Sequence, residues 1–232
     1  MYSSRYCDAD GAERELREHL GLIDADVPAR HLQMRIGRVT HHWNRNCLAV
    51  GLSQGFIEPL EATALLFIQQ TAATFAEFLE KGDVSEAAHE RFNAIVNAHF
   101  EGIRDYIVTH YKTNTRTDTE YWRDNAANLN LSDDLKKLYS QWMTGKSIVP
   151  GIRQQLIGRG YPVFSWFALM AGMGVFPDAA ELRPPTAAEA RCRMVEIDDL
   201  IARSAQNYPD HKRTLASIPP RRRAPALQAY FW

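Results

Sequence analysis

Helical periodicity dominates this chain from Pro59 onward. Apolar residues recur there every three or four positions, as they do on the buried face of an amphipathic helix. Proline suits the first helical position, because its missing N–H would have no intrahelical partner. A helix is therefore expected to begin at Pro59 and to stop at Gly82. The same spacing predicts further helices over residues 10–20, 85–111, 119–127, 133–143, 164–173 and 186–207.

Strand-like alternation is confined to the segment before Pro59. Residues 31–39 alternate with a period of two, and residues 42–51 form a second apolar run that ends at Gly51. Two or three strands cannot form an independent sheet of ordinary size. We therefore predict an α+β fold that is mostly α, in which the strands complete a sheet whose remainder lies elsewhere.

Composition and charge argue against several classes of protein. The 232 residues are 45% apolar, which is enough for a packed core, and a net charge of -1 gives no field that favours nucleic acid or a membrane surface. The most apolar window, residues 163–176, is shorter than the roughly 20 residues that span a bilayer. The first residues show no charged segment followed by an apolar one, so we expect no signal peptide.

Cysteine and histidine usage argues against disulfide bonds and metal sites. Cys7, Cys47 and Cys192 are odd in number and far apart, which argues against a disulfide framework or a zinc site and is typical of a reducing cytoplasm. The eight histidines lack HxxxH and HExxH spacing, so we expect no metal site.

Residues 45–63 carry the strongest chemical signal. They read as a buried strand, a Gly/Ser loop and a helix start, a unit that presents free backbone N–H groups to an anion. The residues alone leave two interpretations of Glu61, namely catalysis or simple complementation of the helix dipole. If the helix begins at Pro59, the Ala64 N–H already has an intrahelical partner and holds no ligand.

The stretch resembles the signature of the flavin-dependent tryptophan halogenase family, a strand followed by NCxxxGLxxxFxEPLExT. Other pieces of the chain resemble the family in the same order and extend the resemblance to about residues 1–210. They are Met34-Arg35-Ile36-Gly37-Arg38 with Trp43, Arg91-Phe92-Asn93, Arg104-Asp105-Tyr106-Ile107, His110-Tyr111, Thr117-Asp118-Thr119 with Tyr121-Trp122, and residues 164–177.

The resemblance implies a division of the chain and a set of reactants. Residues 1–58 would be the edge of a flavin-monooxygenase-like sheet module, residues 59–183 a helical region, and residues 184–232 a terminal helix with a basic tail at Arg221-Arg222-Arg223. Enzymes of this family use reduced FAD from a flavin reductase, oxygen, and chloride or bromide. Hypohalous acid then reaches an aromatic substrate, free or bound to a carrier or peptide. A homodimer is possible within the family.

The resemblance also implies roles for individual residues. Glu61 matches the family's catalytic glutamate, which accepts a proton from the arene or orients the halogenating agent. The backbone amides of Thr63 and Ala64 would hold the halide, and Gly51, Ser53 and Pro59 would lie near FAD. Substrate-side candidates are Tyr121, Trp122 and Trp166, for which core packing is the alternative.

Two departures from the family pattern matter. Ala62 and Ala64 replace the family's serine and glycine, and alanine does not adopt a positive φ cheaply. No GxGxxG follows any strand, so the dinucleotide-binding turn, the catalytic lysine and the WxWxIP box are expected upstream. We expect this chain to bind no cofactor and to be inactive by itself. The alternatives are a flavin monooxygenase-type homologue that does not halogenate, a gene remnant, or a helical partner-binding module.

The segment that leads into the predicted helix over residues 164–173 bears on the substrate. Residues 146–166 contain no Asp or Glu but contain Lys146, Arg153 and Arg159. A buried ammonium group needs a compensating acceptor or charge, and this segment offers repulsion from its three cations instead. We therefore expect free tryptophan to be a poor substrate. The alternative is that these cations face solvent and that the missing half of the protein supplies the acceptor.

Overall fold

The computed structural model describes residues 2–219, which form two compact units with a division between Leu182 and Arg183. The first unit contains the predicted segment 1–58 and the predicted segment 59–183 up to Leu182. It is mostly helical, which confirms the predicted balance of elements. Its first helix, α1 (Ala9–Leu20), begins where the Asp8 carboxylate accepts from the Gly11 N–H, and ends at Gly21 in a left-handed conformation.

The strands are shorter than the sequence predicts and pair only with each other. β1 (Gly37–Arg38) pairs with β4 (Gly55–Phe56), and β2 (Trp43–Asn44) pairs with β3 (Cys47–Leu48), both antiparallel. The prediction of one strand over residues 42–51 is wrong, because the chain reverses there in a tight hairpin.

The predicted strand over residues 31–39 is also mostly absent. Only Gly37 and Arg38 are paired, whereas residues 31–36 have no regular secondary structure and are all exposed. Alternation reports a strand only where a neighbouring strand supplies backbone partners. Within residues 2–219 no sheet exceeds two strands, so the expected flavin-monooxygenase-like sheet is not seen in this chain.

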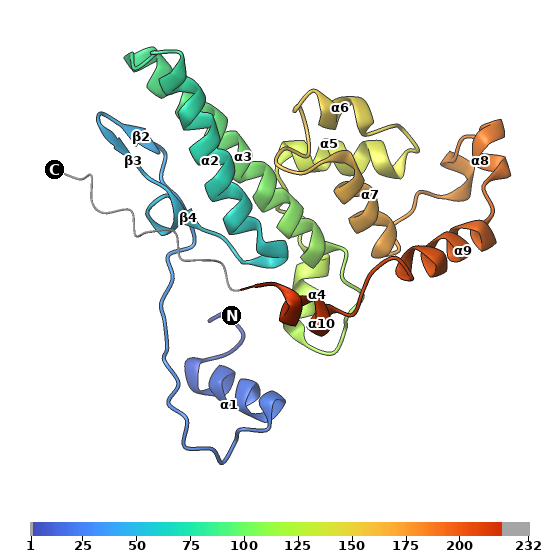
Figure 1. Cartoon of the computed structure of the whole chain (residues 1–232), viewed down its shortest axis with the longest axis horizontal. Coiled ribbons are helices and arrows are strands. Elements are labelled where there is room, and N and C mark those ends of the chain that lie inside the picture. The colour runs from blue at the N-terminus through green and yellow to red at the C-terminus, as the bar shows by residue number, and fades with distance from the viewer. Residues whose placement is uncertain (1, 220–232) are drawn as a thin grey trace. The chain divides into compact units, whose positions relative to one another are not determined.

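Two long helices form the main core. α2 (Thr63–Glu80) and α3 (Glu86–Lys112) lie side by side, with the β2–β3 hairpin beside them (Figure 1). Ser85 begins α3 by accepting from the Ala88 N–H, as the predicted boundary at residue 85 requires. Trp43 ties the hairpin to this pair, since Phe75 and Phe92 contact its ring edge-to-face at 5.0 and 5.6 Å.

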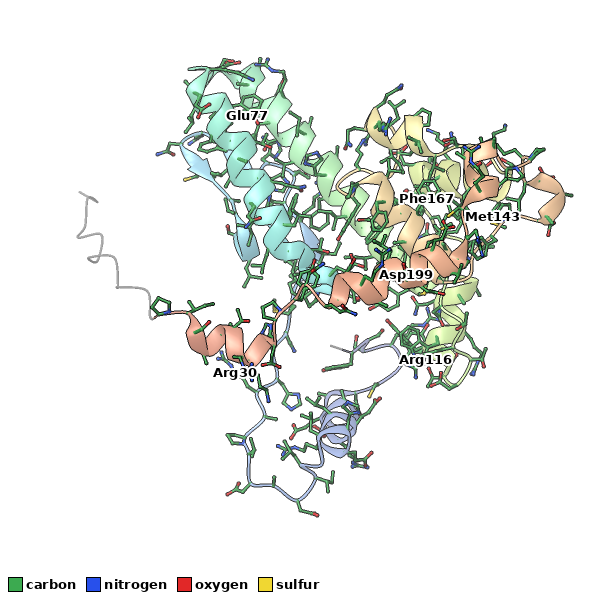
Figure 2. All side chains as sticks on the ribbon, turned by 45° about the vertical axis from the view of Figure 1, so that its right-hand side comes forward. Arg30, Glu77, Arg116, Met143, Phe167 and Asp199 are labelled. Carbon is green, nitrogen blue, oxygen red and sulfur yellow. The ribbon has the colours of Figure 1, made fainter. Side chains whose placement is uncertain are left out.

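Four shorter helices complete the first unit: α4 (Glu120–Ala127), α5 (Asp133–Met143), α6 (Val149–Arg153) and α7 (Val163–Gly172). α5, α6 and α7 lie together beside the C-terminal half of α3 (Figure 1), where Ser132 before α5 donates to Asp105. Met143 on α5 and Phe167 on α7 lie near one another in Figure 2, consistent with the 5.3 Å between the Trp142 and Phe167 rings. Short 3₁₀ turns lie at η1 (Gly51–Ser53), η2 (Leu60–Ala62) and η3 (Ala179–Glu181).

The second unit contains α8 (Ala187–Arg191), α9 (Met194–Ala205) and α10 (His211–Ser217). The predicted single helix over residues 186–207 is wrong, because Cys192 and Arg193 adopt extended backbone angles between α8 and α9. The predicted basic tail at Arg221-Arg222-Arg223 lies outside the described residues. None of the helices in residues 2–219 is both long and apolar enough to cross a membrane.

Candidate functional site

The helix predicted to begin at Pro59 begins four residues later. Glu61 and Ala62 have φ/ψ of 52/31° and 54/25°, both in the left-handed region, and α2 starts at Thr63. The prediction of a first helical position at Pro59 is therefore wrong. Each non-glycine residue in this region costs about 1–2 kcal/mol. Such residues persist only where the surroundings hold them, and they are frequent at functional sites.

Buried side chains hold this turn from inside the protein. The Thr63 hydroxyl donates to the Leu60 carbonyl oxygen and also bonds to the Tyr161 hydroxyl. Thr63 and Tyr161 are only 1% and 7% exposed, so water does not compete for these bonds. The turn is thus connected to a residue 98 positions further along the chain.

The Glu61 carboxylate points to a polar group on α3. Its side chain is 52% exposed, and its Oε1 lies 3.5 Å from His110 Nε2. His110 Nδ1 donates to the Tyr106 carbonyl oxygen at 2.9 Å, so Nε2 is the nitrogen left to face Glu61. With Nδ1 protonated, Nε2 attracts a carboxylate only when the imidazole is positively charged.

Tyr106 lies one turn before His110 on α3 and is close enough to feel the charge of Glu61. Burial, followed by the negative charge of Glu61, raises the pKa of Tyr106 to about 12. Its phenol therefore stays protonated at neutral pH and donates to the Ser165 carbonyl oxygen at 3.3 Å. The Tyr106 ring stacks on Tyr161 with centroids 3.7 Å apart. Tyr106 therefore packs against the residue whose hydroxyl bonds to Thr63 at the turn.

The start of α2 offers backbone amides beside Glu61. The Thr63 N–H donates to the Leu60 carbonyl oxygen within the turn. Ala64 is exposed and is the second residue of α2, in the turn where N–H groups lack intrahelical acceptors. The anticipated difficulty of a positive φ at Ala64 does not arise, because Glu61 and Ala62 take the left-handed angles.

The loop before the turn is shaped by local bonds. Gly51 has φ of 65°, and the Ser53 hydroxyl accepts from the Val50 N–H and donates to the Val50 carbonyl oxygen. Gly55 permits the β1–β4 pairing, since a Cβ there would lie 2.5 Å from the Gly37 carbonyl oxygen. Gly51 and Ser53 thus fix the loop's path. Pro59, with φ/ψ of -79/36°, directly precedes the left-handed turn.

The substrate-side candidates fall into two places. Tyr121 and Trp122 on α4 are half-buried against Tyr111, whose ring stacks on Trp122 at 5.9 Å. Tyr111 donates to the Glu58 carboxylate, and the Arg116 guanidinium, labelled beside α4 in Figure 2, lies 4.6 Å from the Trp122 ring centre.

Trp166 lies in the core instead. It is 0% exposed, its Nε1 donates to the Gly158 carbonyl oxygen at 2.9 Å, and its ring meets Tyr106 edge-to-face at 5.0 Å. In this chain Trp166 packs against the Tyr106 ring from inside the core and is not accessible from the surface.

Sequence reasoning missed three residues of this site. His110 and Tyr106 lie four positions apart and therefore on one face of α3, which was a detectable signal. Nothing in their spacing indicates that this face meets Glu61. Tyr161 gave no signal beyond being aromatic.

The residues present fit some ligands better than others. The amide of Ala64 at a helix start suits a small anion. A dinucleotide pyrophosphate needs a glycine-rich turn between a strand and a helix, and the sequence has no GxGxxG. Within residues 2–219 no cluster of His, Cys, Asp and Glu is arranged to hold a metal ion.

Comparison with known proteins places these features in a family context. Residues 1–188 match the family model described as tryptophan halogenase. The chain is 33% identical over 220 residues to the 7-chloro-L-tryptophan 6-halogenase KtzR of Kutzneria sp. (strain 744), covering 94% of this chain and 42% of that protein. It is 34% identical over 197 residues to the tryptophan 6-halogenase SttH of Streptomyces toxytricini, covering 82% and 36%.

The fold agrees with the sequence matches. BrvH, a flavin-dependent halogenase from Brevundimonas sp. BAL3, superimposes with a TM-score of 0.77 at 31% identity, over 94% of this chain and 44% of that chain. The chain thus spans about two fifths of the length of these relatives.

Proposed function

The chain belongs to the tryptophan halogenase family, and we propose that it forms the C-terminal part of a flavin-dependent halogenase that acts on an aromatic, indole-type substrate. Reduced FAD from a flavin reductase, oxygen, and chloride or bromide are the other reactants. The observation that carries this proposal is the left-handed turn at Leu60–Ala62, which presents the half-exposed Glu61 carboxylate beside His110 at the start of α2.

Glu61 acts as the proton acceptor in this proposal. When hypohalous acid delivers its halogen to the ring, a carbon–halogen bond forms and the oxygen–halogen bond breaks. The ring carbon then loses its proton to Glu61, which restores aromaticity, and the proton finally combines with the released hydroxide as water. His110, 3.5 Å away, stabilises the carboxylate before the transfer when its imidazole is charged.

The chain contributes only part of the cofactor site. Bound reduced FAD would supply the activation of oxygen that oxidises the halide. The Ala64 amide would hold the halide, and Gly51, Ser53 and Pro59 would line the flavin side of the loop. The sequence offers no GxGxxG turn for the pyrophosphate. We therefore propose that another part of the polypeptide, or a second chain, holds most of FAD. This chain alone would neither retain FAD nor catalyse halogenation.

Residues 31–36 would join the flavin-binding part through strand pairing. They have no partner strand within residues 2–219, and their alternate apolar side chains Leu32, Met34 and Ile36 are 64%, 40% and 74% exposed. An apolar strand without a partner is a template for pairing with another strand. We propose that this segment completes the flavin-monooxygenase-like sheet of the assembled enzyme.

The proposal is tested by reconstitution. The chain is co-expressed with the flavin-binding part of a relative such as BrvH, and the purified complex is supplied with a flavin reductase, FAD, NADH, bromide and indole. Mass spectrometry is expected to detect bromoindole from the complex and none from the chain alone. Retention of FAD by the complex without any halogenated product would favour a non-halogenating homologue.

A further inference from the structure

We propose that Tyr161 is a positioning residue that holds Glu61 in its left-handed conformation through the hydroxyl of Thr63. The importance of this turn for catalysis rests on the proposed function, whereas the hold on the backbone does not. The inference follows from hydrogen bonds that join the start of α2 to the segment before α7.

The direction of the hydrogen bonds is fixed by chemistry. The Leu60 carbonyl oxygen can only accept, so the Thr63 hydroxyl must donate its single proton there. The Tyr161 hydroxyl must then be the donor to Thr63 Oγ1. Burial raises the pKa of Tyr161, so its proton stays in place at neutral pH. The result is a one-way chain from Tyr161 through Thr63 to Leu60.

This chain closes around the two strained residues. Leu60 and Thr63 directly flank Glu61 and Ala62, and the Thr63 N–H also donates to the Leu60 carbonyl oxygen. Bonds across the ends of a turn oppose its opening. Tyr161 adds a bond from outside the turn, which connects the turn to the segment before α7.

Tyr161 is itself held firmly. Its ring stacks on Tyr106 at an interplanar angle of 19°, and it follows Gly158 and Gly160, which both have positive φ. A Cβ on Gly160 would lie 3.0 Å from Ile103, so the loop passes close to α3. Because α3 also carries His110, one helix locates both Tyr161 and the imidazole that faces Glu61.

The first test measures the backbone of the full chain by nuclear magnetic resonance. The three-bond coupling between amide and α protons, with the 13C shifts, reports φ at Glu61 and Ala62. Tyr161→Phe keeps the stacked ring and removes the hydroxyl. We expect it to lower the ratio of left-handed to other conformers by about fivefold, which corresponds to the net value of one hydrogen bond. Unchanged couplings and shifts in Tyr161→Phe would overturn the proposal.

Further variants separate positioning from general damage. Thr63→Val should act like Tyr161→Phe, whereas Thr63→Ser keeps the hydroxyl and should preserve the turn. Ala62→Gly removes part of the left-handed cost and should partly restore the turn in a Tyr161→Phe background. Tyr139→Phe, which removes a phenol hydroxyl on α5, is the matched control. An equal disturbance of the turn by Tyr139→Phe would contradict a specific role for Tyr161.

The second test uses the reconstituted complex. Tyr161→Phe should lower kcat about fivefold to tenfold with little change in KM, because the substrate-binding surface stays intact while Glu61 is aimed less often. Ala62→Gly should recover part of this loss, and the control Tyr139→Phe on α5 should cause none. If the complex does not halogenate at all, the proposed function fails while the backbone measurement still decides the role of Tyr161. A higher KM with unchanged kcat would contradict positioning of Glu61.

Discussion

The Glu61 carboxylate lies beside His110, and its negative charge acts on Tyr106. The Tyr106 phenol, with a pKa raised to about 12, stays neutral, and the His110 imidazole faces the carboxylate. A carboxylate that is half-exposed and paired at 3.5 Å can exchange protons with both substrate and solvent. At the scale of single residues, the site therefore has the parts of a proton acceptor.

The direct test of this role is Glu61→Gln in the reconstituted enzyme. The amide is nearly isosteric but cannot take up the ring proton, so halogenation should fall ~10²-fold or more while flavin oxidation is nearly unchanged. Product is followed by mass spectrometry and flavin oxidation by absorbance. Glu77→Gln, at the far end of α2 (Figure 2), is the control. Equal halogenation by Glu61→Gln and the control would return Glu61 to the role of complementing the helix dipole.

His42 makes stability depend on pH. It is 1% exposed, its Nε2 donates to Asn97, and its Nδ1 has no partner, so burial lowers its pKa. Arg38 and His41 lower it further. The unfolded chain therefore binds more protons below about pH 6.5, and the free energy of unfolding should fall as pH falls through that value.

The prediction is measured by denaturant unfolding between pH 7.5 and 5.5. His42→Gln should flatten this dependence, although only in part, because burial also lowers the pKa of His99. An identical slope in the variant and the parent chain would exclude His42 as a source of the effect.

At the scale of elements, the β2–β3 hairpin depends on α3. Asn93 is buried, its Oδ1 accepts from the Trp43 N–H at 2.8 Å, and its Nδ2 donates to the Trp43 carbonyl oxygen at 2.9 Å. These bonds replace the sheet partners that so short a hairpin lacks. Asn93 thus determines where the hairpin and the following loop sit.

Asn93→Ala should lower the free energy of unfolding by about 2–4 kcal/mol, since two buried backbone groups lose their partners. Denaturant titration of the chain measures the change. The exposed Asn130→Ala is the control and should change stability by less than about 0.5 kcal/mol. A loss in Asn93→Ala no larger than in the control would show that water replaces the lost bonds.

The elements also show what a sequence can predict. The helices expected over residues 85–111 and 133–143 are observed within one residue at each end, because Ser85, Ser132 and the apolar spacing are local signals. The left-handed turn could not be predicted, since Glu58-Pro59-Leu60-Glu61 reads as a helix start. This conformation occurs together with the hydrogen bond between Thr63 and Tyr161, which is distant in sequence. The strand at residues 31–36 has the right pattern but no partner in residues 2–219.

At the scale of the whole molecule, residues 31–36 are the proposed link to the flavin-binding part. Ile36→Glu should prevent co-purification of the two parts, because a charge would enter the paired sheet face. It should leave the stability of the chain alone unchanged, since Ile36 is 74% exposed there. Leu129→Glu, at an 81% exposed position, is the matched control and should co-purify normally. Normal co-purification of Ile36→Glu would exclude this segment as the link.

The choice of substrate depends on what can accept an ammonium group. Two of the three cations in residues 146–166 do not act as expected, because Lys146 and Arg153 are exposed; Arg159 is 3.5 Å from Asp134. Repulsion is therefore a weaker argument than the sequence suggested, and the lack of any Asp or Glu in this segment carries the prediction.

A buried ammonium without an acceptor is costly, so a substrate without one should react faster. In a competition assay with the reconstituted enzyme, we expect more halogenated indole-3-propionate than halogenated tryptophan from equal concentrations. Indole, which carries neither charge, is the reference that separates loss of the ammonium from attraction of the carboxylate. A clear preference for tryptophan would mean that the flavin-binding part, or a carboxylate such as Glu58, supplies the acceptor.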